Sequence, residues 1–171
     1  MNQKKMQKLI FENQNLTILS DLNEQKILLK FNQGAVLIIG TNSESELLII
    51  RQIRYGQTQL NYEFPSGGIN VNETPLQAAI RELNEETGYQ GDLRQVAIVQ
   101  PLMGLVDLPL HIFLGHNLQE VPIKERKKMD IDEKIEIKFK SLNFIQKLAL
   151  GTNQIDGYLI LGLTYYLINN I

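Results

Sequence analysis

Cysteine is absent from this chain of 171 residues, and histidine occurs only twice, as His111 and His116. Without cysteine the protein can form no disulfide, no thiolate metal site and no cysteine nucleophile. Two histidines are too few for a histidine-rich metal site. Any bound metal ion would therefore be held by oxygen ligands, which suits Mg²⁺, Mn²⁺ or Ca²⁺.

Strong net charge and long apolar runs are also lacking. The formal net charge of −2 gives no general electrostatic reason to expect nucleic acid binding. No stretch reaches the roughly 18 uninterrupted apolar residues of a membrane span, and the most apolar run, residues 158–168, is too short. No apolar run or small-residue cleavage site follows the lysines near the N-terminus, so no signal peptide is expected. We expect a cytoplasmic protein with no membrane or nucleic acid partner.

The chain does have enough apolar sequence for a real core, since hydrophobic residues make up 43% of it. Predicted strands outnumber predicted helices, which indicates a mixed α+β domain with helices packed on a sheet. The predicted strands span residues 16–21, 25–31, 34–40, 46–54, 62–64, 93–99, 110–116 and 134–140. A turn is expected at residues 65–68, loops at residues 55–61, 101–109 and 120–133, and helices at residues 75–87, 142–150 and 154–169.

The first of these helices has the clearest local signals. Thr74 is a good N-cap, Pro75 suits the first helical position, Gln77 completes a capping box with Thr74, and Gly88 ends the helix. Apolar residues at helical spacing are expected to face the core. These residues are Leu76, Ala79, Ile80 and Leu83.

The same helix carries Arg81, Glu82, Glu85 and Glu86 within six positions. Acidic residues crowded onto one short helix repel each other, so stability alone does not favour this pattern. A helical residue advances by about 100°, which places the three glutamates on one side and lets Arg81 pair with Glu85. The cluster therefore predicts a site for a hard cation. An ordinary amphipathic helix with a solvated acidic face is the alternative interpretation.

These charges belong to a longer pattern that resembles the Nudix box. The specified positions of the box occur here at the same fixed spacings. Only the last position departs mildly from the pattern, because it is usually aliphatic and is a tyrosine here. The matching residues are Gly67, Glu73, Arg81, Glu82, Leu83, Glu85, Glu86, Gly88 and Tyr89. The resemblance implies a Nudix-like α/β/α sandwich with a mixed sheet, preceded by an antiparallel strand segment. It also implies cation-dependent hydrolysis of a nucleoside diphosphate linked to another group.

The resemblance assigns roles to individual residues of the box. Glu82 and Glu86 match the main metal ligands, and Glu85 matches a further ligand or catalytic base. The Ser66 carbonyl matches a backbone ligand, and Arg81 matches the residue that orients the glutamates. The implied cofactor is Mg²⁺, with Mn²⁺ as the other candidate.

Outside the box, residues 51–55 and 63–68 resemble the corresponding segments of ADP-ribose pyrophosphatases, a branch that includes enzymes for other nucleotide sugars. Arg54 would then face the substrate phosphates, although a strand-end arginine that pairs with an acid is an equal alternative. Arg51, Glu63 and Gly104 are the other residues expected to bind substrate. The resemblance therefore implies a small-molecule nucleotide sugar as ligand.

A second acidic segment, residues 130–133, resembles the loop that reaches the metals in this branch. Glu133 matches a loop glutamate and is expected both to bind metal and to take part in catalysis. The acid often found two residues earlier is replaced by Ile131. The base is therefore open between Glu133 and its neighbours Asp130 and Asp132, and a solvated surface loop remains an alternative.

The branch also suggests how the chain is organised. Residues 1–33 are expected to form a strand arm that can cross to a partner subunit in a homodimer, and residues 34–171 to form the Nudix domain. The implied reaction is hydrolysis of ADP-ribose to AMP and ribose 5-phosphate. The alternatives are another nucleotide sugar such as GDP-mannose, a non-catalytic nucleotide-binding domain, and an acidic structural helix in a protein of other function.

Overall fold

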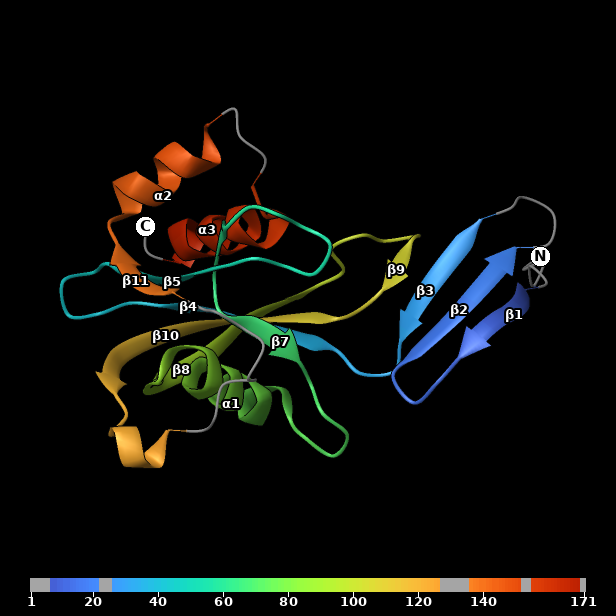
Figure 1. Cartoon of the computed structure of the whole chain (residues 1–171), viewed down its shortest axis with the longest axis horizontal. Helices are drawn as coiled ribbons and strands as arrows, with labels where there is room; N and C mark the ends of the chain where they lie inside the picture. Colours follow the sequence, from blue (N-terminus) through green and yellow to red (C-terminus); the bar gives the residue numbers. More distant parts are fainter. Residues whose placement is uncertain (1–6, 22–25, 127–135, 152–154, 170–171) are drawn as a thin grey trace.

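The computed structural model of the chain describes residues 7–21, 26–126, 136–151 and 155–169. Its strands form three sheets. Two α-helices lie on one side of the central strands, and another α-helix lies on the opposite side (Figure 1). The central sheet contains β7 (Ser66–Gly68), β4 (Ala35–Gly40), β10 (Leu110–Glu120) and β8 (Tyr89–Val99), in that order. A three-stranded sheet contains β11 (Glu136–Lys140), β5 (Leu47–Gln52) and β6 (Asn61–Glu63).

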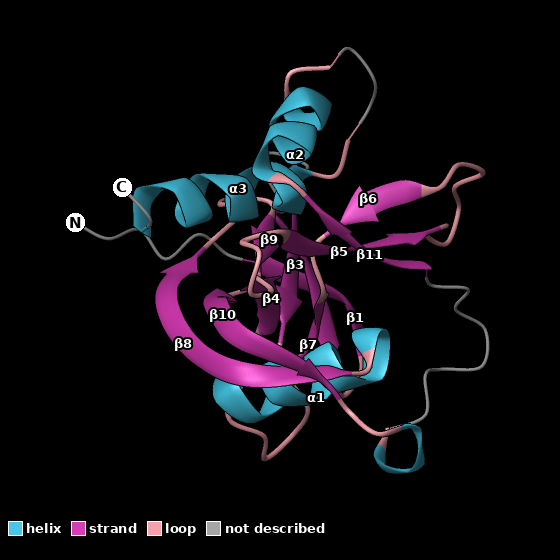
Figure 2. Ribbon diagram, turned by 90° about the vertical axis from the view of Figure 1, so that its left-hand side faces the viewer, coloured by secondary structure: helices cyan, strands magenta, loops and turns pink. Residues whose placement is uncertain are grey.

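Helix α1 (Pro75–Thr87) packs on one face of these sheets, while α2 (Leu142–Ala149) and α3 (Gly157–Asn169) pack on the other (Figure 2). Strand β4 shows why both faces must be covered, because its side chains alternate between two cores. Val36 and Ile38 pack with α1, whereas Leu37 and Ile39 pack with α3. Since β4 and β10 are parallel and the other pairs of the central sheet are antiparallel, the predicted α/β/α sandwich with a mixed sheet is confirmed.

The predicted caps of α1 are confirmed. The Thr74 side chain accepts a hydrogen bond from the Gln77 backbone, the reciprocal bond completes the capping box, and Gly88 adopts the left-handed conformation that ends the helix. The predicted buried face is partly wrong, because Leu76 and Ile80 are about half exposed. Ala79 and Leu83 are buried as expected, and Ala78 is buried as well, which turns the helix slightly from the expected orientation.

Several predicted boundaries need correction. Residues 66–68 form a strand rather than only a turn, because their backbone pairs with β4. The strands β8 and β10 are longer than expected, since β8 begins at Tyr89 and β10 ends at Glu120, and these added residues pair with each other. A 3₁₀ turn at Ile123–Glu125 also falls in a predicted loop, and the start predicted for the last helix, Gln154, lies outside the described residues.

The third sheet contains β1 (Gln7–Glu12), β2 (Leu16–Asp21), β3 (Ile27–Phe31) and β9 (Val106–Asp107). It extends away from the rest of the molecule (Figure 1). Strand β9 belongs to the connection between β8 and β10, yet it pairs in parallel with β3. Backbone hydrogen bonds between β3 and β9 thus join the expected N-terminal arm to the expected Nudix domain. No helix in the described ranges is long and apolar enough to span a membrane.

Candidate functional site

Arg81 connects the acidic residues of α1 to the backbone in front of the helix. Its Nε and Nη2 donate to the two carboxylate oxygens of Glu73 at 2.8 and 2.9 Å. Its Nη1 donates to Glu82 at 2.7 Å and to Glu85 at 3.0 Å, and Nη2 also donates to the Gly68 carbonyl at 2.8 Å. These contacts, the bond to Glu73 first, raise the pKa of Arg81 above its ordinary value. The guanidinium therefore remains charged and fixes the glutamates in place.

Glu82 lies directly against the β7 backbone. A Cβ atom added to Gly67 would lie 2.1 Å from the Glu82 carboxyl carbon, so a larger residue at that position would displace the carboxylate. Burial raises the pKa of Glu82, and Arg81 opposes this shift. The carboxylate is thus poorly hydrated and has a cationic partner, with which a metal ion would have to compete.

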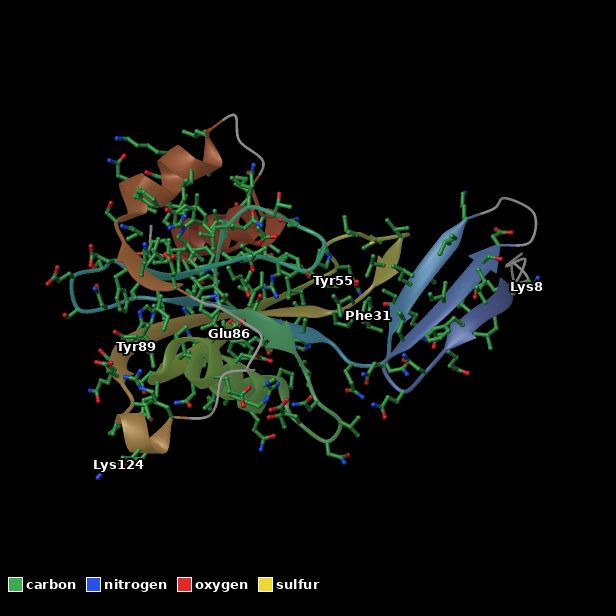
Figure 3. All side chains as sticks on the ribbon, viewed as in Figure 1. Lys8, Phe31, Tyr55, Glu86, Tyr89 and Lys124 are labelled. Atoms are coloured by element: carbon green, nitrogen blue, oxygen red, sulfur yellow. The ribbon has the colours of Figure 1, made fainter. Side chains whose placement is uncertain are left out.

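Glu86 joins the end of α1 to the same strand. The Ser66 backbone N–H donates to its Oε2 at 2.9 Å, and the residue is buried. Figure 3 labels Glu86 near β7. Glu85 is the most exposed of the three glutamates, with 29% of its side chain accessible. The structure therefore brings Glu82 and Glu86 to β7, while Glu85 lies further out on Arg81.

The donors at this place are carboxylate oxygens and backbone carbonyls, which are the ligand types that hard divalent cations require. Within the described part of the chain, no three His, Asp or Glu side chains are grouped so that they could hold a metal ion as they lie. Arg81 donates to one carboxylate oxygen of Glu82 and to one of Glu85. The chemistry of the donor set fits a divalent cation, which these side chains would have to rearrange to ligate together.

A cavity of about 480 Å³ lies on the other side of β7. Its walls come from β4, β6, β7, the segment after β5 and the start of α3. The lining residues are Ala35, Val36, Arg54, Gln57, Asn61, Glu63, Ser66, Gly67, Ile155, Asp156, Gly157 and Tyr158. Because Ser66 and Gly67 line it and also contact Glu86 and Glu82, the cavity and the acidic helix share one wall.

Three of the predicted site residues meet in this cavity, namely Arg54, Glu63 and Ser66. Arg54 forms an ion pair with Glu63, its Nη2 lying 2.6 Å from Oε2, and Gln52 donates to the same oxygen at 3.1 Å. Glu63 is almost completely buried, whereas 42% of the Arg54 side chain is accessible. The expected alternative of a strand-end arginine paired with an acid thus describes the structure, and part of Arg54 still faces the cavity.

Two other predicted substrate-binding residues are not among those that line the cavity. Arg51 of β5 forms an ion pair with Glu136 at 3.2 Å, and its guanidinium lies 4.9 Å from the centre of the Tyr62 ring. Gly104 precedes β9 with φ of 92° and has open space around its Cβ position. Glu133 and its neighbours Asp130, Ile131 and Asp132 lie outside the described residues.

Sequence reasoning assigned no role to Asp156 and Tyr158, which line the cavity at the start of α3. Burial raises the pKa of Asp156, and the charge of Glu63 adds to this effect. Burial and Asp156 likewise raise the pKa of Tyr158. The available signal was the start predicted for the last helix at residue 154, which by itself carries no chemical role.

A larger and more open hollow of about 1020 Å³ lies elsewhere, along the ends of β4, β8 and β10. No residue predicted for the site lines it. Because it contacts neither β7 nor the glutamates of α1, we place the candidate site at the smaller cavity.

The arrangement of the acidic helix, the glycine strand and the cavity can be compared with known proteins. The model of the NUDIX domain matches residues 31–136. The chain belongs to the Nudix family.

Two curated relatives extend the comparison. This Nudix chain is 29% identical over 125 residues to an ADP-ribose pyrophosphatase of Bacillus subtilis (strain 168), which covers 72% of the chain and 66% of that protein. It is 32% identical over 112 residues to a CMP-5'-(N-acetyl-N-hydroxy-3-aminopropyl)phosphonate hydrolase of Streptomyces rubellomurinus, covering 61% and 54%. The matched segments thus span less than two thirds of either relative's length.

A solved structure described as an ADP compounds hydrolase superposes with a TM-score of 0.75 at 18% identity. The superposition covers 96% of this chain and 90% of the other. At this identity the likeness establishes the fold, including the N-terminal strands within the covered region, and carries no information about the substrate.

Proposed function

We propose that this Nudix protein is a divalent-cation-dependent hydrolase of nucleoside diphosphate sugars. The preferred substrate is ADP-ribose, which is cleaved at the diphosphate to AMP and ribose 5-phosphate. The observation that carries the proposal is the shared wall at Ser66–Gly67, with the glutamates of α1 on one side and a polar cavity on the other. The activity named for the Bacillus subtilis relative supports ADP-ribose as the substrate.

Residues of the box supply the cation site in this proposal. Glu82 and Glu86 are the main ligands, with Glu85 and the Ser66 carbonyl as further ones. These residues would hold Mg²⁺, or Mn²⁺ in its place, which would supply neutralisation of the diphosphate charge and a lower pKa for an attacking water. Arg81 is a positioning residue, because it holds the carboxylates of Glu82 and Glu85 at a fixed place on the helix.

Glu133 remains the proposed catalytic base and an additional metal ligand, with Asp130 and Asp132 as the alternatives. The replacement of the expected acid by Ile131 makes this assignment open to direct test. Glu85 is the candidate base within α1, since it is the most accessible of the box glutamates.

Arg54 is proposed to bind the substrate phosphates. Its ion pair with Glu63 fixes the guanidinium at the cavity, while the accessible part of the side chain faces the ligand. Arg51 and Gly104 do not line this cavity. They remain proposed contacts for parts of the substrate that extend beyond it.

We further propose that two copies of the chain form a homodimer through the N-terminal sheet. The six residues of β1 are all exposed, and Leu9, Ile10 and Phe11 are each about half accessible. An accessible apolar edge strand is a template for pairing with another chain. Sedimentation analysis of the whole chain, with Phe11→Lys as the disrupted variant, tests the dimer.

A second candidate substrate is another nucleotide-linked compound. The similarity to the CMP-phosphonate hydrolase shows that related sequences act on a different base. Product analysis with Mg²⁺ on ADP-ribose, GDP-mannose, a CMP-linked phosphonate, a dinucleotide and a nucleoside triphosphate separates these possibilities. We expect the highest kcat/KM for ADP-ribose. Binding of these compounds without any turnover would identify a non-catalytic nucleotide-binding domain instead.

A further inference from the structure

The cavity beside β7 differs in charge from a site built for phosphate. Among the residues that line it, the groups that can carry charge near neutral pH are Arg54, Glu63 and Asp156. Arg54 is already paired with Glu63, so Asp156 adds a negative charge that no second basic lining residue balances. A ligand group that carries a negative charge in addition to the diphosphate is therefore disfavoured in this cavity.

Asp156 is held at the cavity by its place in the chain. Its Oδ2 accepts a hydrogen bond from the Leu159 backbone N–H at 3.2 Å, three residues later, so it acts as the N-cap of α3. Capping fixes the orientation of the carboxylate at the point where α3 meets the cavity. Glu63 is close enough that its charge helps to raise the pKa of Asp156, which places the two carboxylates around the same space.

The rest of the lining suits hydroxyl groups. Carboxylates accept hydrogen bonds from hydroxyls, and the side-chain amides of Gln57 and Asn61 can both donate and accept. A cavity of about 480 Å³ falls within the size range of small-molecule sites. A neutral, hydroxyl-rich group fits this chemistry better than a phosphate or an apolar ring does.

We propose that Asp156 is a specificity-determining residue that binds a hydroxyl group of the sugar attached to the nucleoside diphosphate. The inference rests on the proposed function and adds the part of the substrate that this cavity selects. The diphosphate then lies at the Ser66–Gly67 wall near Glu82 and Glu86. The neutral sugar occupies the cavity, and a sugar that carries an additional phosphate is rejected there.

The test compares ADP-ribose with an analogue that lacks one hydroxyl of the terminal pentose. The proteins are the wild type, Asp156→Asn, and Asp92→Asn as a matched control outside the cavity. Asparagine retains the capping function, so α3 should keep its stability. We expect the wild type and Asp92→Asn to prefer ADP-ribose by about 10-fold in kcat/KM, as for one good hydrogen bond. In Asp156→Asn this ratio should fall to about 2-fold or less.

An unchanged ratio in Asp156→Asn, with a normal melting temperature, would overturn the inference while leaving the proposed function intact. A merely structural role would lower activity on both substrates equally and leave the ratio unchanged. If the wild type hydrolyses no nucleotide sugar, the proposed function fails, and calorimetric affinities for the same two compounds in EDTA decide the inference separately. Equal affinity of the wild type for both compounds would then contradict it.

Discussion

The Gly67 backbone and the Glu82 carboxylate are in direct contact, because a Cβ added to Gly67 would lie 2.1 Å from the Glu82 carboxyl carbon. The Glu82 carboxylate can therefore keep its present position only with glycine at residue 67. The contact holds one of the proposed metal ligands against the wall of the cavity. It also offers a substitution that moves a ligand without removing it.

Gly67→Ala should inactivate the enzyme while leaving all of its acidic residues in place. Displacement of Glu82 by about 1 Å is expected to lower kcat by about 100-fold. Gly68→Ala is the matched control, since no atom lies within 4 Å of its Cβ position, and it should remain active. Steady-state kinetics on ADP-ribose measure both variants, and equal activity of the two would show that the contact is unimportant.

Arg81→Lys should also reduce turnover, although the positive charge is retained. A lysine cannot reproduce the fork that reaches Glu73, Glu82 and Glu85 together. We expect kcat to fall by about 10–100-fold, as for other residues that orient metal ligands. Arg126→Lys is the control, because Arg126 contacts Glu120 and the Val121 carbonyl instead. A similar loss in both variants would point to general destabilisation.

The ion pair between Arg54 and Glu63 should contribute to stability as well as to substrate binding. Arg54→Ala leaves the buried Glu63 carboxylate without its bidentate partner, which we expect to cost about 1–3 kcal/mol. The double variant Arg54→Ala/Glu63→Gln should recover part of that loss, because the buried charge is removed. Chemical denaturation measures stability, and a raised KM in both variants would support contact of Arg54 with the phosphates. Strictly additive effects would argue against coupling of the pair.

Glu82 should make stability depend on pH in the absence of divalent cations. Burial raises its pKa in the folded protein. A carboxyl group of this kind costs stability when it is ionised, so the cost is absent below the unfolded-state pKa and complete above the folded-state pKa. Glu82→Gln should therefore melt at a higher temperature than the wild type near pH 8 in EDTA. The difference in melting temperature between the variant and the wild type should shrink as the pH falls from the folded-state pKa to the unfolded-state pKa of Glu82. Calorimetry from pH 4 to 8 provides the comparison, and a lower melting temperature of the variant at every pH would contradict the assigned shift.

The local features of α1 could be predicted from sequence because their causes lie within the helix. The Thr74–Gln77 capping box and the Gly88 stop depend on neighbours a few residues away. The strand at residues 66–68 was missed because it exists only through pairing with β4, which is distant in sequence. The exposure of Leu76 and Ile80 likewise depends on how α1 is set against the sheet.

The candidate site also has a part that depends on local sequence and a part that depends on distant residues. The fixed spacing of the box predicted the side chains that gather on α1, including the pairing of Arg81 with Glu85. The cavity could not be predicted, because it brings together β4, β6 and β7 with the start of α3, more than a hundred residues away from β4. Asp156 is consequently visible as a site residue only in the folded chain.

The central claim is that the glutamates of α1 hold the cation that drives diphosphate cleavage, and Glu86 offers its most direct test. An amide at this position can still accept the Ser66 N–H bond, so Glu86→Gln should fold normally while losing a ligand charge. The measurement is the release of AMP from ADP-ribose as a function of Mg²⁺ concentration, for the wild type and Glu86→Gln. We predict equal amounts of AMP and ribose 5-phosphate from the wild type only when Mg²⁺ is present, and a rate at least about 100-fold lower for the variant. Near-normal turnover by Glu86→Gln in saturating Mg²⁺ would contradict the account.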